Sequence, residues 1–253
     1  MSRSRVVGGE RVPSARVIPL RDGRIEALTL PGGKGVPLLV LGGVETGLRP
    51  LAGTEQVLAR RWERRTERRG VTVLGRPIPD EPRDAERLMH PRLVADAVAT
   101  ALGELGLWPV AIEAESGGGR ISLWLAVDRP DLVSRMALAS VASETAPDSP
   151  MAPRMSSWIQ MAEAGRWAEF FASMAQAMKA GDEAESASFA TAARLQPRPA
   201  TPERFIGELR ATLDPSSWVT DRLGEISAPT LVLAGGQDRV VPPDVTRLVA
   251  ERI

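Results

Sequence analysis

Short apolar runs alternate with longer segments of helical spacing over most of this chain. Runs bounded by glycine, proline or polar residues are typical of strands. They predict strands at residues 16–20, 24–30, 37–41, 71–74, 109–112, 135–141 and 229–234. Apolar residues three and four apart predict helices over residues 51–69, 91–107, 120–127 and 244–252. Strands that alternate with helices imply a mostly parallel sheet with helices on both faces, the α/β class.

Residues 146–224 interrupt this alternation. They carry no strand pattern but several helical segments rich in alanine, methionine and tryptophan. Open parallel sheets bind their ligands at the carboxyl ends of the strands, so a helical insertion is expected to cover that edge. The predicted organisation is an α/β core of residues 15–145 and 225–253 with a helical cap at residues 146–224.

Composition excludes several classes of function. The chain has 253 residues and a formal net charge of zero, so neither nucleic acid nor an anionic membrane surface is expected as a partner. It contains no cysteine, which excludes thiol catalysis, disulfides and cysteine-based metal sites. The N-terminus lacks the apolar segment of a signal peptide, and no apolar run is long enough to span a membrane. A cytoplasmic protein is therefore expected.

The strongest candidate for chemistry is Ser116, at the tip of a predicted strand, turn and helix. An apolar run ends at Ile112, and helical spacing resumes at Arg120. So sharp a turn strains the backbone of its central residue and needs small residues two before and two after it. Ala114 and Gly118 meet that requirement. The turn lifts a hydroxyl clear of the sheet and aims the first amides of the next helix at the group that it attacks.

This turn resembles the nucleophile elbow of the α/β-hydrolase family, and the resemblance covers about residues 15–253. It implies that Ser116 is a nucleophile. It also implies that Asp238, in the sequence Gly-Gly-Gln-Asp after the strand at 229–234, is the acid that orients a catalytic histidine. The implied reaction is hydrolysis of a small-molecule carboxylic ester or lactone through an acyl-serine, with no cofactor and no metal.

The same resemblance implies an oxyanion hole, a pair of amides that stabilises the tetrahedral intermediate. Gly42, Gly43 and Val44 stand where the family carries His-Gly-x, so the Val44 amide is the expected donor, or that of Gly43 if the register shifts by one. The second expected donor is the amide of Gly117, directly after the serine. Apolar cap residues are expected to line the substrate pocket, in particular Met155, Trp158 and Met161.

The family's catalytic histidine has no counterpart at the expected place. His90 is the single histidine of the 253 residues, and it precedes the serine turn, so a surface position is expected for it rather than the role of the base. The family's last strand, histidine loop and last helix would lie beyond Ile253. The chain as given is therefore expected to be inactive or very weak, and a truncated polypeptide is favoured over an evolved pseudoenzyme. Residues 229–234 would then form an exposed edge strand, which favours a homodimer.

Two other functions stay open at this point. A catalytically silent binding protein would keep the fold without the base, and an acyltransferase would use the same nucleophile with an acceptor other than water.

Two carboxylates next to the serine are unusual for a covered central strand. Glu113 and Glu115 lie on one face of it, where burial is costly unless the charge is paired or neutralised. Either an arginine from a flanking helix pairs with them, or a carboxyl group is held protonated near the site.

Overall fold

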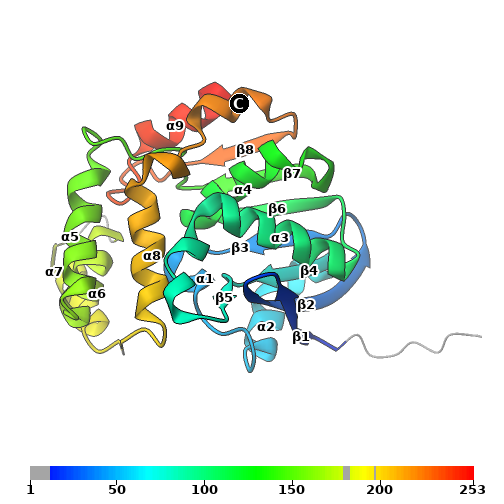
Figure 1. Ribbon diagram of the computed structural model, residues 1–253, viewed down its shortest axis with the longest axis horizontal. Helices are drawn as coiled ribbons and strands as arrows, with labels where there is room; N and C mark the ends of the chain where they lie inside the picture. The colour runs from blue at the N-terminus through cyan, green and yellow to red at the C-terminus, as the bar shows by residue number, and fades with distance from the viewer. Residues whose placement is uncertain (1–11, 179–182, 197) are drawn as a thin grey trace, which may run out of the picture.

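The computed structural model describes residues 12–178, 183–196 and 198–253. Within these residues one sheet has the strand order β1-β2-β4-β3-β6-β7-β8, with β5 paired to β2 (Figure 1). The strands are β1 (Ser14–Leu20), β2 (Gly23–Lys34), β3 (Leu38–Leu41), β4 (Arg69–Leu74), β5 (Ile78–Pro79), β6 (Val110–Glu115), β7 (Val133–Ala139) and β8 (Thr230–Leu233).

The sheet has an antiparallel part and a parallel part. Strands β1 and β2 form an antiparallel hairpin, and β2 also pairs antiparallel with β4. From β4 onward every neighbouring pair along the order is parallel. The predicted mostly parallel sheet of an α/β fold is confirmed. Strand β5 and the extension of β2 to Lys34 were not predicted.

Helices cover both faces of the sheet. They are α1 (Val44–Gly47), α2 (Glu55–Thr66), α3 (Pro91–Leu105), α4 (Gly117–Asp128) and α9 (Pro243–Arg252), with short 3₁₀ turns η1 (Pro82–Asp84), η2 (Arg87–Met89) and η3 (Pro130–Leu132). The main core lies between the sheet and α3, α4 and α9, and a smaller core lies under α2 on the other face. Helix α3 begins at Pro91, which is pre-set for a first helical position, and ends before Gly106, whose φ of 66° suits glycine.

The described residues between 146 and 224 form helices and 3₁₀ turns and no strand. They are α5 (Met151–Glu163), α6 (Trp167–Met178), α7 (Glu183–Ala193), α8 (Pro202–Leu213), η4 (Pro215–Ser217) and η5 (Thr220–Glu225). Figure 1 shows α5, α6 and α8 standing beside the end of the sheet where the parallel strands finish. The division into a core and a separate cap domain stays a prediction. No helix of the described chain is long and apolar enough to cross a membrane.

One buried side chain on α4, the helix that begins directly after Ser116, hydrogen-bonds to the segment that precedes α5 and to the segment that follows α8. The Arg120 guanidinium, on α4, donates to the Ala142 carbonyl (2.9 Å) and to Thr145 Oγ1 (3.0 Å) ahead of α5. It also donates to the Thr212 carbonyl (3.1 Å) and to Ser217 Oγ (3.3 Å) at the end of α8 and beyond. Burial lowers the pKa of Arg120 to about 10, so the cation keeps its charge at neutral pH.

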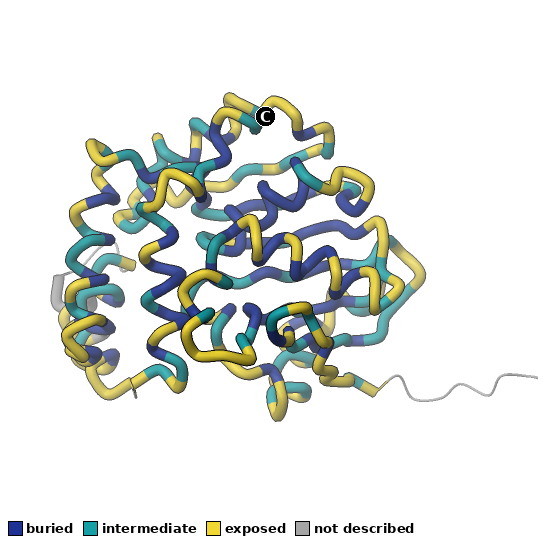
Figure 2. Tube along the Cα trace, viewed as in Figure 1, coloured by how far each residue is buried: buried dark blue, intermediate teal, exposed yellow. Residues whose placement is uncertain are grey.

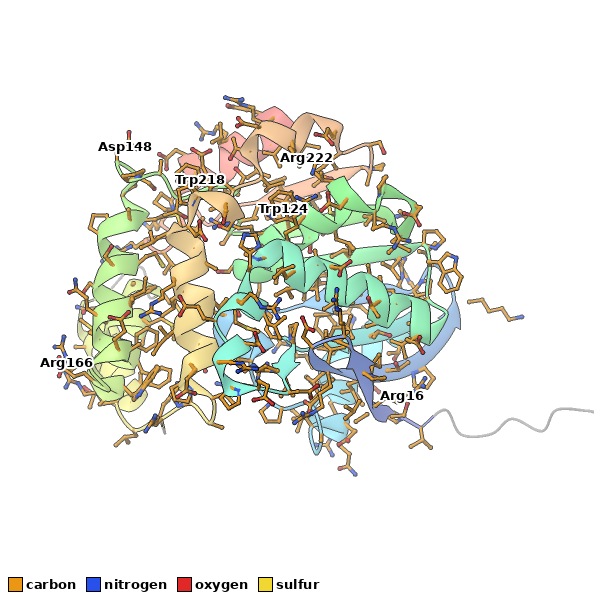
Figure 3. All side chains as sticks on the ribbon, in the orientation of Figure 1. Arg16, Trp124, Asp148, Arg166, Trp218 and Arg222 are labelled. Carbon is orange, nitrogen blue, oxygen red and sulfur yellow. The ribbon has the colours of Figure 1, made fainter. Side chains whose placement is uncertain are left out.

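A second tie joins α4 to the segment that follows α8. Trp124 Nε1 donates to the Ser217 carbonyl (2.9 Å), and the Arg222 guanidinium lies 5.9 Å from the Trp124 ring centre. Figure 3 shows these side chains, with Trp218, gathered where α4 meets the C-terminal part of the chain. Hydrogen bonds from α4 therefore hold both the segment before α5 and the segment after α8 in place.

Strand β8 is the edge of the sheet in the part of the chain that the structure describes, and β7 is its one partner there. Val232 packs against the main core, whereas the alternate residues Leu231 and Leu233 are 57% and 51% exposed. In Figure 2 the central strands are dark blue, but β8 is teal and yellow. The expected exposed edge is present among the described residues, and the homodimer stays a prediction.

Candidate active site

Ser116 occupies the sharp turn between β6 and α4. Its backbone has φ 50° and ψ −122°, a conformation that costs a non-glycine residue about 1–3 kcal/mol and needs support from its surroundings. Part of that support is a hydrogen bond from the Ser116 N–H to the Ala139 carbonyl of β7 (3.0 Å). A Cβ at Gly118 would lie 2.5 Å from the Gly42 carbonyl oxygen and closer still to that of Leu41. The small residue predicted two after the serine is therefore required by contact between α4 and the end of β3.

Two helix N-termini flank the serine. Val44 is the first residue of α1 and Gly117 the first of α4, and first-turn amides have no acceptor within their own helix. In the described chain neither N–H donates to another group. The two loops touch, because a Cβ placed on Gly117 would be 3.5 Å from Val44 Cγ2, and one placed on Gly43 would be 3.9 Å from Ser116 Oγ. Two amides that donate to no other group of the described chain thus lie in the two loops that meet at Ser116.

The peptides around Gly43 are held by other groups. The Gly42 carbonyl accepts from Arg76 Nη2 (2.8 Å), and the Gly43 N–H points to Glu115 Oε1 (3.5 Å). The Gly43 carbonyl accepts from the Gly47 N–H (2.8 Å). Of the two amides considered from the sequence, that of Gly43 is engaged and that of Val44 is open.

Asp238 lies in the loop after β8. Its Oδ1 accepts from the N–H groups of Val240 (2.8 Å) and Val241 (2.9 Å), and its own N–H donates to the Gly235 carbonyl (3.0 Å). This turn fixes the carboxylate independently of the sheet. Asp238 and Ser116 line the same cavity, at the carboxyl ends of β8 and β6.

That cavity has a volume of about 520 Å³ and a largely apolar wall. The wall is supplied by α5, α6 and α8, and its apolar side chains include Met151, Met155, Trp158, Phe170, Met174, Phe205 and Leu209. Met155 and Trp158, predicted from the sequence, are among them. The contributions of α8 were not foreseen, because nothing in the sequence says which face of this helix turns toward the serine.

Met161 was predicted beside them and does not line the cavity. It packs instead at the border of an aromatic cluster formed by Trp158, Trp167, Phe170, Phe171 and Phe205. At roughly 100° per residue, Met161 is turned about 120° around α5 from Met155, so the two face different neighbours.

A buried ion pair under the serine loop was missed by the sequence analysis. Arg76 follows β4 and Glu208 lies on α8, and their side chains are 0% and 8% exposed. Arg76 Nε lies 3.0 Å from Glu208 Oε2, and Arg76 Nη2 lies 2.8 Å from Oε1. Glu208 lines the cavity. The sequence offered a possible signal, because Arg204 and Glu208 are four residues apart and would share a helix face beside the apolar Phe205.

The carboxylates before the serine have separate partners. Glu113 accepts two hydrogen bonds from Arg65 of α2, at 3.0 and 3.2 Å, so the expectation of an arginine from a flanking helix is correct for this residue. Glu115 is exposed and faces the Gly43 N–H and the Thr46 hydroxyl at the cavity. Among the described residues no three His, Asp or Glu side chains are grouped to hold a metal ion.

His90 does not face the Ser116 cavity. It caps α3, with its Nδ1 accepting from the Arg92 N–H (3.3 Å), and its Nε2 lies 3.2 Å from Ser216 Oγ. Because Nδ1 accepts a hydrogen bond, the neutral ring carries its proton on Nε2 and donates to Ser216. The hydrogen bonds from the Ser216 N–H and hydroxyl hold the pKa of Asp214 below its usual range. His90 is thus part of a capping network at the start of α3, a role that the sequence analysis did not predict.

A known protein family matches more than half of the chain. The family described as Serine aminopeptidase, S33 (Hydrolase_4) matches residues 92–253, more than half of the sequence, and this range includes Ser116 and Asp238. No curated protein matches the chain by sequence.

Several solved structures share the fold. The α/β hydrolase MGS-M2, from a Medee basin deep-sea metagenome library, is 15% identical with a TM-score of 0.75, over 94% of this chain and 86% of that one. The esterase EaEST from Exiguobacterium antarcticum is 18% identical with a TM-score of 0.70, over 95% and 88%. Est816, described as an N-acyl homoserine lactone degrading enzyme, is 21% identical with a TM-score of 0.69, over 94% and 88%. At these identities the likeness shows a shared fold.

Proposed function

The chain belongs to the serine aminopeptidase S33 family of α/β-hydrolases, and on that premise we propose that it cleaves a carboxylic ester or lactone through an acyl-serine on Ser116. One observation carries the proposal. The strained serine turn lies next to two open helix N-terminal amides and shares an apolar cavity with Asp238. Nucleophile, oxyanion donors and acid are the parts that acyl transfer requires.

In the proposed mechanism Ser116 Oγ attacks the carbonyl carbon while a base takes the hydroxyl proton. The carbonyl oxygen becomes an oxyanion and accepts hydrogen bonds from the Val44 and Gly117 amides. The tetrahedral intermediate collapses, the alcohol leaves with the proton, and the acyl group stays on Ser116. Water, deprotonated by the same base, attacks this ester, and the proton returns to Ser116 Oγ as the acid departs.

The base in this scheme is an imidazole between Ser116 and Asp238. The turn around Asp238 Oδ1 supports its role, because a carboxylate fixed in place can orient an imidazole and stabilise its cation. His90 is engaged elsewhere, so the 253 residues hold no imidazole for this position. We therefore expect very weak turnover from this chain alone, since loss of one triad member costs about 10⁴–10⁶ in kcat.

The cavity wall favours an uncharged, apolar acyl group. Methionine and aromatic side chains from α5, α6 and α8 face the serine, and flexible methionines adapt to different acyl shapes. The one buried carboxylate on the wall, Glu208, is neutralised by Arg76 and is not available to pair with a cationic substrate. Short to medium fatty acyl esters and lactones with an apolar side chain fit these features best.

The test supplies the missing imidazole from solution. Hydrolysis of p-nitrophenyl butyrate by the 253-residue chain is followed with increasing imidazole, beside Ser116→Ala to subtract the reaction of imidazole in solution. We expect a saturable, Ser116-dependent stimulation that Asp238→Asn weakens. Equal rates for the chain and for Ser116→Ala at every imidazole concentration, with no acyl group on Ser116 by mass spectrometry, would contradict the proposal.

One observation favours a second candidate, a binding protein for apolar esters without catalysis. The single histidine of these residues is committed to capping α3. In that case butyrate esters bind in the cavity, as detected by calorimetry, but imidazole produces no Ser116-dependent turnover.

A further inference from the structure

We propose that Arg76 and Glu208 are positioning residues that set the oxyanion hole and couple it to helix α8. This inference rests on the proposed function. The evidence is a chain of contacts that runs from α8 through Arg76 to the peptide before Val44.

The first step is the ion pair itself. Glu208 meets Arg76 through both carboxylate oxygens, and both side chains are almost fully buried. Burying two charges carries a large desolvation penalty, and an apolar pair of similar volume is often as stable or more stable. The pair is therefore poor evidence of a stabilising role, and its other contacts indicate what it does.

The second step leads from Arg76 to the Val44 amide. Arg76 Nη2, which contacts Glu208, also donates to the Gly42 carbonyl (2.8 Å). On the other side of that peptide the Gly43 N–H faces Glu115. With this peptide held at both ends and the Gly43 carbonyl bonded to Gly47, the next N–H, that of Val44, is fixed in direction. Arg76 also packs on α1, because any side chain at Gly47 would overlap its guanidinium.

The third step concerns Gly117, the other proposed donor. A Cβ on Gly117 would be 2.8 Å from Glu208 Oε1, so the carboxylate lies directly beside the amide that would hold the oxyanion. An unpaired negative charge there would oppose a developing oxyanion. Arg76 cancels that charge, and Glu208 in turn keeps Arg76 aimed at Gly42.

The coupling to α8 follows from where these groups are anchored. Glu208 belongs to α8, and Arg204 of the same helix donates to the Arg76 carbonyl (2.9 Å). Phe205 and Leu209, their neighbours on α8, face the cavity. An acyl group that packs against α8 therefore contacts the same helix that holds Arg76. Binding of the acyl group in the cavity is in this way linked to the direction of the Val44 amide.

The activity test uses the imidazole-stimulated assay and separates kcat from KM. We expect Arg76→Met and Glu208→Gln to lower kcat about 10–100-fold, as a misplaced oxyanion donor does, while KM changes less than about threefold. Glu163→Gln is the matched control, because Glu163 pairs with Arg210, another arginine of α8, at the surface. It should leave both constants unchanged.

A double variant distinguishes positioning from folding. Arg76→Met with Glu208→Leu replaces the pair by apolar side chains, and we expect it to recover the thermal stability lost in Arg76→Met. Its kcat should stay low, because the donor to the Gly42 carbonyl is still missing. Recovery of kcat together with stability would overturn the proposal.

Amide hydrogen exchange provides a readout that needs no activity. We expect faster exchange in the peptide of residues 42–48 for Glu208→Gln and for Arg76→Met, but not for Glu163→Gln. Unchanged exchange in that peptide would overturn the inference even if the enzyme is active. Faster exchange in a chain that shows no Ser116-dependent turnover would uphold the coupling and reject the proposed function, so the two failures are distinguishable.

Discussion

The nucleophile and the acid of the candidate site are held in opposite ways. Ser116 follows β6, a central strand with β3 on one side and β7 on the other, and it caps α4, a helix whose residues are almost all buried. Asp238 follows β8, whose one partner in the described chain is β7 and whose alternate leucines face outward. The packed strands and helix on either side of the turn fix the serine backbone, whereas two backbone hydrogen bonds within one turn fix the aspartate.

The difference follows from what each group must do. A strained backbone persists only where its surroundings leave no alternative, so the serine turn needs the densest part of the fold. A carboxylate that orients an imidazole needs only a fixed direction, which a local turn provides at an exposed edge. Substitutions should therefore be costly around Ser116 and mild around Asp238, apart from the aspartate itself.

The largest contrast is expected between two glycines. Gly118→Ala should destabilise the fold by about 3 kcal/mol or more, because its Cβ would overlap the carbonyl oxygens at the end of β3. Gly236→Ala, in the Asp238 loop, has open space around its Cβ and should change stability by less than about 0.5 kcal/mol. Urea denaturation of both variants measures the difference. Similar losses of stability in the two variants would mean that the Ser116 turn and the Asp238 loop are packed equally tightly.

The next effect concerns Asp238. Asp238→Ala removes the acceptor of the Val240 and Val241 amides and should cost about 1–2 kcal/mol of stability. Asp238→Asn keeps an oxygen for these amides, so its stability should stay within about 0.5 kcal/mol of the parent while the imidazole-stimulated rate falls. Urea denaturation gives the first quantity and the ester assay the second. A loss of stability in Asp238→Asn equal to that of Asp238→Ala would show that the negative charge, not the turn, holds the loop.

The surroundings of Ser116 were more predictable from the sequence than those of Asp238, because they are defined by a pattern of neighbouring residues. The spacing of Ala114, Ser116 and Gly118 between an apolar run and a helix is a pattern of adjacent residues, and the strand alternation of the core is of the same kind. The turn at Asp238 was also visible, since it follows a buried-looking strand. Features that depend only on neighbouring residues can therefore be predicted from the sequence.

The parts that were missed depend on contacts between distant segments. Arg76 and Glu208 are 132 positions apart, and no spacing rule relates them. Met161 was placed on the cavity because it is apolar and close to Trp158 in sequence, but the cavity lies on one side of α5 only. The Val44 amide was the expected donor, but the contacts of Glu115 and Arg76 that engage the Gly43 peptide instead come from distant segments and were not foreseen.

The helix that follows Ser116 is joined to the C-terminal part of the chain by a carboxylate, Asp128, whose two ion pairs respond to pH. Asp128 ends α4, and it accepts from Arg92 (2.7 Å) and from Arg222 of η5 (2.9 Å). Partial burial raises the pKa of Asp128, but the hydrogen bonds from both arginines outweigh this and hold it below its usual range. The carboxylate's contribution is therefore present above the unfolded pKa of about 4 and is lost as the pH falls through the lowered folded value.

Asp128→Asn should accordingly cost about 0.5–1 kcal/mol at pH 7, since these side chains are partly exposed to solvent and the attraction is screened. Between pH 6 and pH 3, the gap between parent and variant should be constant at first and should narrow once the pH falls below the unfolded pKa of about 4. Urea denaturation across that range measures it. A gap that is constant with pH would show that packing rather than charge is lost.

The smallest effect on stability is expected at the outer face of β8, where the homodimer prediction can be tested. Leu231→Thr with Leu233→Thr should change the free energy of unfolding by less than about 0.5 kcal/mol, because both side chains are already more than half exposed. Val232→Thr, one position away but packed on the core, should cost about 1 kcal/mol or more because it buries a hydroxyl. If an unpaired apolar edge drives self-association, the double leucine variant should elute as a monomer in size-exclusion chromatography at concentrations where the parent chain and Val232→Thr are dimeric. A parent chain that is monomeric at every concentration would contradict the homodimer prediction, and would show that the molecule tolerates this exposed edge although its Ser116 turn is held between packed strands and a buried helix.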